Sequence, residues 1–232
     1  MTRGNDNEDR PSGYASPPCL AHEIDPAYFN LAHVDPQQAL EVERWRKGER
    51  AKLLSERAAL PVTARQTAAR AISAHLDVLL AERFVDLAGL TISAWWPIMA
   101  ELDLRFWLAG LAARGARAAL PLVMERSSPL AFRIWSPGTR MERGIWNILV
   151  PAGGPEVVPD ITLAPVVGWD SAAYRLGYGG GYFDRTLAAL SPRPLAIGIG
   201  FQMAQVASIF PQPHDIPMAA IVTEVGVQTV QP

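Results

Sequence analysis

Apolar positions follow a helical spacing in the first part of the chain and form short continuous runs in the second part. Residues 39–60 contain no proline and are rich in Arg, Lys, Glu, Ala and Leu, so they predict a helix that ends where Pro61 interrupts it. Thr63 and Gln66 have the spacing of a capping box, and the apolar residues after them recur at helical intervals. This pattern predicts a second helix directly after the first.

Beyond Gly89, short apolar runs alternate with helical stretches, which is typical of a mainly parallel sheet covered by helices. The expected strands are Thr91–Trp96, Ala118–Val123, Ile161–Val167, Leu195–Ile199 and Ala220–Thr223. Leu130–Trp135 is expected to be an added strand, with an antiparallel direction as one option. A helix over Leu102–Arg114 should end at Gly115, because glycine favours the left-handed cap conformation. The prediction is a single three-layer α/β domain, residues 39–232, with a mainly parallel sheet flanked by helices.

Residues 1–38 differ in composition from the rest of the chain. Five prolines lie there among Gly, Ser, Asn and acidic residues, and such a segment buries too little apolar surface to offset the entropy of ordering. We expect a flexible extension, and the sequence does not indicate its role. The first residues are acidic and polar, with no apolar stretch behind them, so they do not predict a secretory signal.

Composition and charge narrow the classes of function. Apolar residues make up 49% of the chain and charged residues 19%, which excludes overall disorder and a coiled coil. The formal net charge of −2 provides no basic field, so we expect neither a nucleic acid nor a membrane as partner. Cys19 is the only cysteine, which excludes an intrachain disulfide and a cysteine zinc site. A cytoplasmic protein, monomeric or weakly homo-oligomeric, is the expectation.

One long uncharged run, Pro194–Pro213, has the length of a membrane span. Gln202, Gln205, Ser208, two glycines and Pro211 interrupt it, however. We therefore interpret it as a buried strand followed by a short helix.

The segment Arg175–Arg185, with the sequence RLGYGGGYFDR, is the most informative. Its four glycines allow positive φ and close backbone approach, so that consecutive N–H groups can form an anion nest at the start of the following helix. Arg175 supplies a planar fork suited to phosphate, and Asp184 is placed to help hold a magnesium ion bound to phosphate oxygens. These residues indicate a nucleotide phosphate site.

The residues of this segment alone leave a second interpretation open. No Gly-Lys-Ser/Thr follows the glycines, as a Walker A loop requires, and Tyr182 takes the place of the third glycine of GxGxxG. A glycine turn with a purely structural role, with Asp184 as a helix cap, explains the same pattern equally well.

The segment RLGYGGGYFDR also resembles the signature of the 5-formyltetrahydrofolate cyclo-ligase family, whose members are also called methenyltetrahydrofolate synthetases. Other segments resemble the family in the same order: RKGERAKLLSERAAL at 46–60, WWPIMAELD at 95–103, ALPLV at 119–123, GIWNILVP at 144–151, APVVGWD at 164–170 and PHDIPMAAIVTE at 213–224. The resemblance implies a ligase that uses ATP and Mg²⁺ to close a small-molecule folate substrate, 5-formyltetrahydrofolate, to 5,10-methenyltetrahydrofolate, with release of ADP and phosphate.

The resemblance also implies roles for individual residues. Arg175 and Arg50 are expected to be catalytic, and Asp184 and Asp215 to bind the metal. ATP binding is implied for Arg46, Lys47, Arg50, Arg175, Leu176, Gly177, Tyr178, Gly179, Gly180, Gly181, Tyr182 and Phe183. Substrate binding is implied for Trp96, Glu101, Trp146, Tyr178 and Tyr182.

Structural alternatives exist for several of these residues. Arg46 and Arg50 share a helix face with Arg57, and without a ligand they would form a solvated surface balanced by Glu43 and Glu49.

The aromatic and acidic residues also have alternatives. Trp96 is otherwise a core residue and Glu101 a cap of the following helix, and Trp146 and Asn147 allow the same two interpretations. Asp170 either orients Arg175 or forms a turn. We interpret His214 as structural.

Departures from the family pattern motivate other functions. Arg46 stands where the family usually has lysine, Ala173-Tyr174 replaces a common glycine, and Gly180 stands where lysine sometimes occurs. A second hypothesis is a non-catalytic nucleotide- or folate-binding module on the same scaffold. A third is a related small-molecule kinase or ligase.

Overall fold

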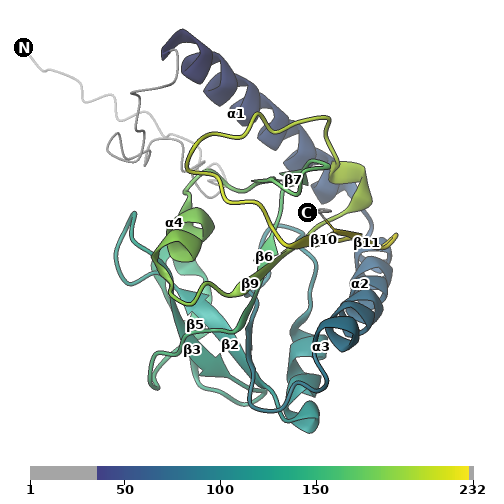
Figure 1. Cartoon of the computed structure of the whole chain (residues 1–232), viewed down its shortest axis with the longest axis vertical. Helices are drawn as coiled ribbons and strands as arrows, with labels where there is room; N and C mark the ends of the chain where they lie inside the picture. Colours follow the sequence, from purple (N-terminus) through teal and green to yellow (C-terminus); the bar gives the residue numbers. More distant parts are fainter. Residues whose placement is uncertain (1–35, 230–232) are drawn as a thin grey trace, which may run out of the picture.

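Two long helices, α1 (Pro36–Ala59) and α2 (Val62–Arg83), form the first part of the described chain (Figure 1). The computed structural model describes residues 36–229, so residues 1–35 of the predicted extension, with Cys19, lie outside the described residues. The first helix begins at Pro36 rather than at residue 39, because proline is well tolerated in the first turn of a helix. The predicted capping box is wrong. Pro61 occupies the N-cap position of α2 and no side chain caps the helix, so Thr63 lies inside its first turn.

A seven-stranded sheet forms the centre of the domain, in the order β11-β10-β9-β6-β1-β2-β3. Its strands are β1 (Thr91–Ser93), β2 (Arg117–Leu122), β3 (Ala131–Trp135), β6 (Ile161–Pro165), β9 (Leu195–Ile199), β10 (Ala220–Val222) and β11 (Val227–Thr229). The five inner strands run parallel, whereas β3 and β11 are antiparallel at the two edges. The prediction of a mainly parallel sheet is thereby confirmed, and Leu130–Trp135 takes the antiparallel option.

Helices and loops cover both faces of this sheet. Ile161, Leu163 and Ile197 pack in one core with the buried face of α2 and with α3 (Arg105–Gly110). Ala164 and Ala196, on the opposite face, pack in a second core with helix α4 (Tyr182–Ala189) and with Leu53 of α1. Alternate residues of the strands therefore enter opposite cores, which explains why the runs read as continuously apolar.

Among the predicted elements that are shorter than expected, the first strand and the helix from Leu102 differ most from the prediction. The first strand ends at Ser93 rather than Trp96, and the amide of Ala94 still donates to the carbonyl of Ala119 at 3.1 Å. The helix predicted from Leu102 begins at Arg105, and it continues as a 3-10 turn, η4 (Leu111–Arg114). Gly115 follows with φ of 74°, which confirms the predicted left-handed cap. The residues from Trp96 to Asp103 are thereby free to form a loop beyond the sheet.

Short elements that the sequence did not predict surround the carboxyl ends of the strands. Strands β4 (Met141–Arg143) and β5 (Leu149–Pro151) form a hairpin with a 3-10 turn, η5 (Ile145–Asn147), at its tip. Strands β7 (Gly168–Trp169) and β8 (Arg175–Leu176) form a second small antiparallel pair.

A 3-10 turn, η6 (Gln202–Ala204), follows β9, as expected for a strand followed by a short helix. Within residues 36–229, no helix has both the length and the apolar character needed to cross a membrane.

Candidate functional site

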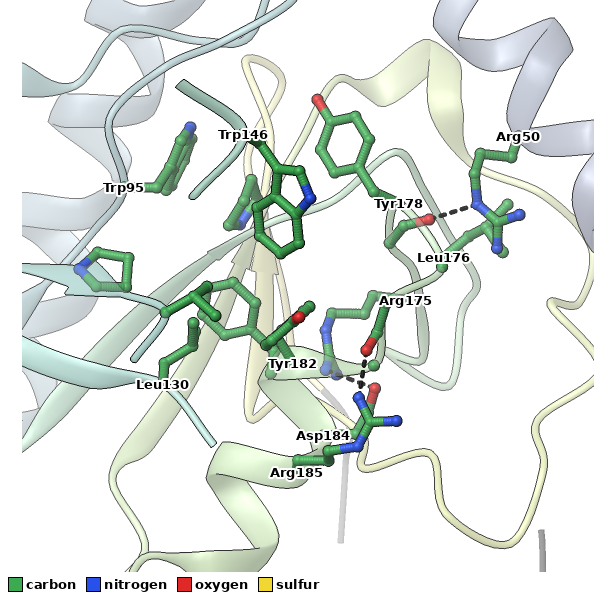
Figure 2. Close-up of a pocket in the computed structure, with 18 of the residues that line it drawn as sticks. Arg50, Trp95, Leu130, Trp146, Arg175, Leu176, Tyr178, Tyr182, Asp184 and Arg185 are labelled. Atoms are coloured by element: carbon green, nitrogen blue, oxygen red, sulfur yellow. Dashed lines mark hydrogen bonds and ion pairs between the residues drawn. The ribbon is translucent and has the colours of Figure 1, made fainter. Parts of the chain in front are cut away.

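A cavity of 650 Å³ lies at the carboxyl edge of the parallel sheet, where open α/β sheets commonly bind ligands (Figure 2). Its wall is formed by α1, the 95–101 loop, the end of β2, the β4–β5 hairpin, the glycine segment and residues 212–215. All of the residues for which the sequence predicted an ATP, substrate, metal or catalytic role line this one cavity. Asn147, for which a role was left open, does not line it.

The glycine segment forms a loop, residues 177–181, between β8 and α4. Gly179 and Gly181 have φ of 108° and 63°, which non-glycine residues rarely adopt, and Gly181 is the N-cap of α4. Within residues 36–229, the amides of Gly179, Gly180 and Gly181 donate no hydrogen bond to another group of the chain. The loop therefore presents main-chain N–H groups and a helix N-terminus at one end of the cavity, as an anion site requires.

Two arginines hold this loop through its carbonyl groups. Arg50 Nε donates to the carbonyl oxygen of Gly177 at 2.6 Å, and Arg185 Nη1 donates to the carbonyl oxygen of Gly180 (Figure 2). Sequence reasoning missed Arg185, although its position in the first turn after the glycines was a usable signal. Because the arginines bind the carbonyls, they fix the shape of the loop and bring positive charge to it.

The predicted phosphate ligand Arg175 is buried and paired with Asp184. Arg175 Nη2 lies 3.0 Å from Asp184 Oδ2, and Arg175 Nη1 donates to the carbonyl of Ile216. The second oxygen of Asp184 accepts from the amide of Ile216 at 3.0 Å. This pair therefore ties the glycine loop and α4 to the segment that contains Asp215.

The predicted phosphate ligand Arg46 makes contacts within the chain. Its guanidinium donates to the carbonyls of Ile209 and Phe210 at 2.9 Å each, and it lies 2.5 Å from Asp215 Oδ2. Trp45 packs edge-on against Phe210, with ring centroids 4.9 Å apart. Arg46 thus fastens the 209–215 segment to α1 at the edge of the cavity.

The interpretation of this helix face as a solvated surface is wrong. Arg50 and Arg57 are 9% and 5% exposed, so both are buried. Glu49, which was expected to balance them, pairs with Lys52 instead. Burial of several guanidinium groups on one face is costly unless polar partners or a ligand satisfy them.

Glu101 lies buried at the other end of the cavity. Its Oε2 accepts from the amide of Ile98 and its Oε1 accepts from the hydroxyl of Tyr178, each at 2.8 Å. The carboxylate does not cap α3, whose N-cap is Leu104, so the cap interpretation is wrong. Burial raises the pKa of Glu101, while the Ile98 amide and the charge of Arg57 act in the opposite direction. A raised pKa in a cavity is typical of a functional carboxyl group.

Aromatic side chains also line the cavity. The guanidinium of Arg105, held by Asp103, lies 4.4 Å from the ring of Trp96 and therefore covers one face of that ring. Trp146 contacts Tyr182 edge-on, with ring centroids 5.3 Å apart. Sequence reasoning missed Trp95, which lines the cavity and whose buried indole N–H lies near the Glu101 carboxylate and acts to lower its pKa. This end of the cavity therefore suits a flat ligand with polar edges.

Backbone strain occurs in two loops of this wall. Met99 and Ala100 both have positive φ, and so do Trp146 and Asn147. Such conformations cost about 1–3 kcal/mol each and are concentrated at functional sites. The side chains of Met99 and Trp146 line the cavity.

Asp170 takes one of its two alternatives, and the interpretation of His214 as structural stays a prediction. Asp170 accepts from the amides of Ala172, Tyr174 and Ile209, so it forms a turn and does not contact Arg175. His214 lines the cavity, and its Nε2 lies 3.8 Å from Asp215 Oδ1.

The two predicted metal ligands fit only one kind of magnesium site. Asp184 and Asp215 both line the cavity, but each is paired with an arginine. Within the described range 36–229, no group of three His, Cys, Asp or Glu side chains could hold a metal ion. Mg²⁺ commonly uses one or two carboxylates together with substrate phosphates and water. The residues therefore fit an ion that phosphate oxygens mainly hold, rather than an ion in a cage of protein ligands.

Comparison with known proteins identifies relatives over most of the chain. The sequence model of the 5-formyltetrahydrofolate cyclo-ligase family matches residues 42–224. The chain is 28% identical over 182 residues to a 5-formyltetrahydrofolate cyclo-ligase of Mycolicibacterium smegmatis, covering 75% of this chain and 91% of that protein. It is 24% identical over 176 residues to the Haemophilus influenzae protein of the same name, covering 73% and 92%.

Solved structures share the fold. The NMR structure of 5,10-methenyltetrahydrofolate synthetase from Aquifex aeolicus matches with a TM-score of 0.69 at 23% identity, covering 81% of this chain and 93% of the other. The structure of a 5,10-methenyltetrahydrofolate synthetase from Mycoplasma pneumoniae matches with a TM-score of 0.62 at 23% identity, covering 77% and 98%. The predicted α/β architecture therefore also occurs in these two solved structures.

Proposed function

The chain belongs to the 5-formyltetrahydrofolate cyclo-ligase family, and from this we propose that it closes 5-formyltetrahydrofolate to 5,10-methenyltetrahydrofolate with ATP and Mg²⁺, releasing ADP and phosphate. One observation supports the proposal most directly. A single cavity has a cationic, glycine-rich end and an aromatic end with a buried carboxylate, so it suits a polyphosphate and a flat heterocycle side by side.

The polyphosphate is assigned to the glycine end. There, Arg50, Arg175 and Arg185 lie around the loop whose amides make no bonds within the described chain. Arg46 and Lys47 line the cavity along the same helix. Guanidinium groups and main-chain amides at a helix N-terminus are the donors that phosphate groups prefer.

The folate is assigned to the end that contains Glu101. The carboxylate is an acceptor for the N–H donors of the pterin edge, and Trp96, Trp146 and Tyr182 provide apolar and aromatic walls. Ring stacking of this kind contributes about 0.5–1.5 kcal/mol beyond the burial of area.

The proposed reaction has two steps. The formyl oxygen attacks the γ-phosphorus of ATP, and ADP leaves. N10 then forms a bond to the activated carbon while the carbon–oxygen bond breaks, phosphate departs with the former formyl oxygen, and the N10 proton passes to solvent. This route needs no protein nucleophile, and no serine, threonine or cysteine is among the described residues that line the cavity.

The protein supplies positions and charge. Arg175 and Arg50 would stabilise the negative charge that develops on the transferred phosphoryl group, and Glu101 would hold the ring system so that the formyl oxygen faces it. Mg²⁺, held by phosphate oxygens and by Asp184 or Asp215, would supply further neutralisation of that charge.

The direct test is to mix the purified chain with 5-formyltetrahydrofolate, ATP and Mg²⁺ and to follow the absorbance of the methenyl product. We expect product and ADP in equal amounts, and neither when ATP or Mg²⁺ is left out. Binding of both ligands without formation of the chromophore would instead support the non-catalytic module.

A further inference from the structure

Tyr178 connects the two ends of the cavity. It stands in the glycine loop between Gly177 and Gly179, and in Figure 2 its ring points away from the Arg175–Asp184 pair. Its hydroxyl donates to Glu101 Oε1 at 2.8 Å. One residue of the proposed nucleotide loop is therefore bonded directly to the carboxylate at the proposed folate end.

Arg57 holds this connection in place from outside the cavity. Arg57 is buried and does not line the cavity. Its Nη2 donates to the carbonyl oxygen of Met99 at 3.1 Å and also to the hydroxyl of Tyr178. Met99 and Ala100 form the strained turn that leads into Glu101. Arg57 therefore holds the two loops in a fixed relation without reaching a ligand itself.

The hydrogen bonds on Glu101 leave capacity for a ligand. Each carboxylate oxygen can accept two hydrogen bonds, and Oε1 and Oε2 each receive one, from Tyr178 and Ile98. Burial and the nearby charge of Glu101 raise the pKa of Tyr178, so the hydroxyl keeps its proton and remains a donor. The orientation of the carboxylate is consequently set from its own loop, by the Ile98 amide and the nearby Trp95 indole N–H, and from the glycine loop by the Tyr178 hydroxyl.

We propose that Tyr178 and Arg57 are positioning residues, which orient Glu101 and couple the binding of a nucleotide at the glycine loop to the binding of a hydrogen-bond donor at Glu101. This inference rests on the proposed function, which supplies the two ligands. A polyphosphate bound to the amides of the glycine loop further restricts the Tyr178 hydroxyl and, through it, the carboxylate. The second ligand then meets a site that is already ordered, which is positive coupling, and the coupling must be reciprocal.

Calorimetric titration tests the coupling. A non-hydrolysable ATP analogue with Mg²⁺ is titrated into the full chain with and without saturating 5-formyltetrahydrofolate. For the unmodified protein we expect the Kd of the analogue to fall by about 5- to 150-fold when the folate is present. For Tyr178→Phe, which keeps the ring, we expect a fall of less than about twofold.

Two further variants separate positioning from a general loss of structure. Tyr174→Phe removes a hydroxyl that makes no hydrogen bond within the described chain, and it should keep the full coupling. Arg57→Lys keeps the charge but shortens the side chain and removes the Nη2 group that reaches both Tyr178 and Met99, so it should weaken the coupling.

The outcomes distinguish this inference from the proposed function. If the unmodified chain forms the methenyl product but shows no coupling, or if Tyr178→Phe couples the ligands as strongly as the unmodified chain, the inference is overturned and the function stands. If the unmodified chain binds neither ligand or forms no product, the proposed function fails, and this inference fails with it.

Discussion

Arg50 Nε donates to the carbonyl oxygen of Gly177 at 2.6 Å, across a separation of 127 positions in the chain. This bond joins a helix that precedes the sheet to the loop that follows β8. It places a guanidinium next to Gly179, where an added Cβ would lie 3.6 Å from Arg50 Cζ. The anion site is therefore built from two distant parts of the sequence, and each part depends on the other for its shape.

Replacing Arg175 should impair the reaction. Arg175→Ala removes a charged hydrogen-bond donor from the glycine end and leaves Asp184 without its guanidinium partner. A hydrogen bond to a charged group is worth about 1.5–3 kcal/mol, so turnover should slow by roughly ten- to a hundredfold. The measurement is kcat for the methenyl product, with circular dichroism to verify folding. Full activity in a folded variant would exclude Arg175 from the site.

Gly181→Ala should destabilise the fold through its backbone. Gly181 has φ of 63°, and an added Cβ would lie 3.2 Å from Arg185 Nη1. An alanine in the left-handed region costs about 1–2 kcal/mol, which urea unfolding would detect as a lower midpoint. Gly177→Ala is the matched control, because Gly177 has no positive φ and no atom within 4 Å of the added Cβ. Equal losses of stability in the two variants would contradict the structural role of φ at Gly181.

Glu101→Gln should alter how stability depends on pH. Burial raises the pKa of Glu101 above the usual 4.5, with Arg57 and Tyr178 as its charged and titratable neighbours. The folded protein therefore binds a proton more tightly than the unfolded protein, and this carboxyl group lowers the free energy of unfolding as the pH rises from 4.5 through the raised pKa. Glutamine does not titrate. The variant should gain stability relative to the unmodified chain as the pH increases, although its folate affinity falls.

Urea unfolding at several values from about pH 5 to about pH 8 measures this difference. Glu142→Gln, at an exposed carboxyl group on β4, serves as the control. A stability difference for Glu101→Gln that stays constant across this range would show that the carboxyl group is not buried in the folded state.

Asp215→Asn should loosen the segment that Arg46 fastens to α1. The variant loses the ion pair between Asp215 and Arg46, whose side chains are 8% and 14% exposed, respectively. Its loss should cost about 1–3 kcal/mol and speed amide hydrogen exchange in residues 205–217. Asp103→Asn breaks the more exposed pair with Arg105, so it should cost no more than about 1 kcal/mol and leave that exchange unchanged. Identical exchange in both variants would argue against the role of Arg46 as a fastening residue.

The sequence predicted the parts of the site that are local in the chain. Glycines that need positive φ, an arginine before them and a helix after them lie within a few residues of one another, so their pattern was readable. The i, i+4 spacing of Arg46 and Arg50 likewise predicted a shared face, because helix geometry alone decides it.

The remaining features depend on contacts between distant segments. Nothing near Arg46 indicates that it binds the carbonyl of Ile209, and nothing near Tyr178 indicates that its hydroxyl reaches Glu101. The β4–β5 hairpin was missed because its strands have three residues each, too few for a pattern of alternation. The predicted capping box does not form because Pro61 already occupies the N-cap position. Thr63 and Gln66 have the required spacing, but Thr63 lies inside the helix rather than at its cap.

Helix α1 sets the spacing of three arginines that contact three different loops. Arg46, Arg50 and Arg57 each contact a different loop: the 209–215 segment, the glycine loop and the turn at Met99. A helix turns by about 100° for every residue, so inserting or deleting a single residue between Arg46 and Arg57 would aim at least one of these side chains at the wrong partner. The number of residues along this stretch is therefore as strict a requirement as their identity.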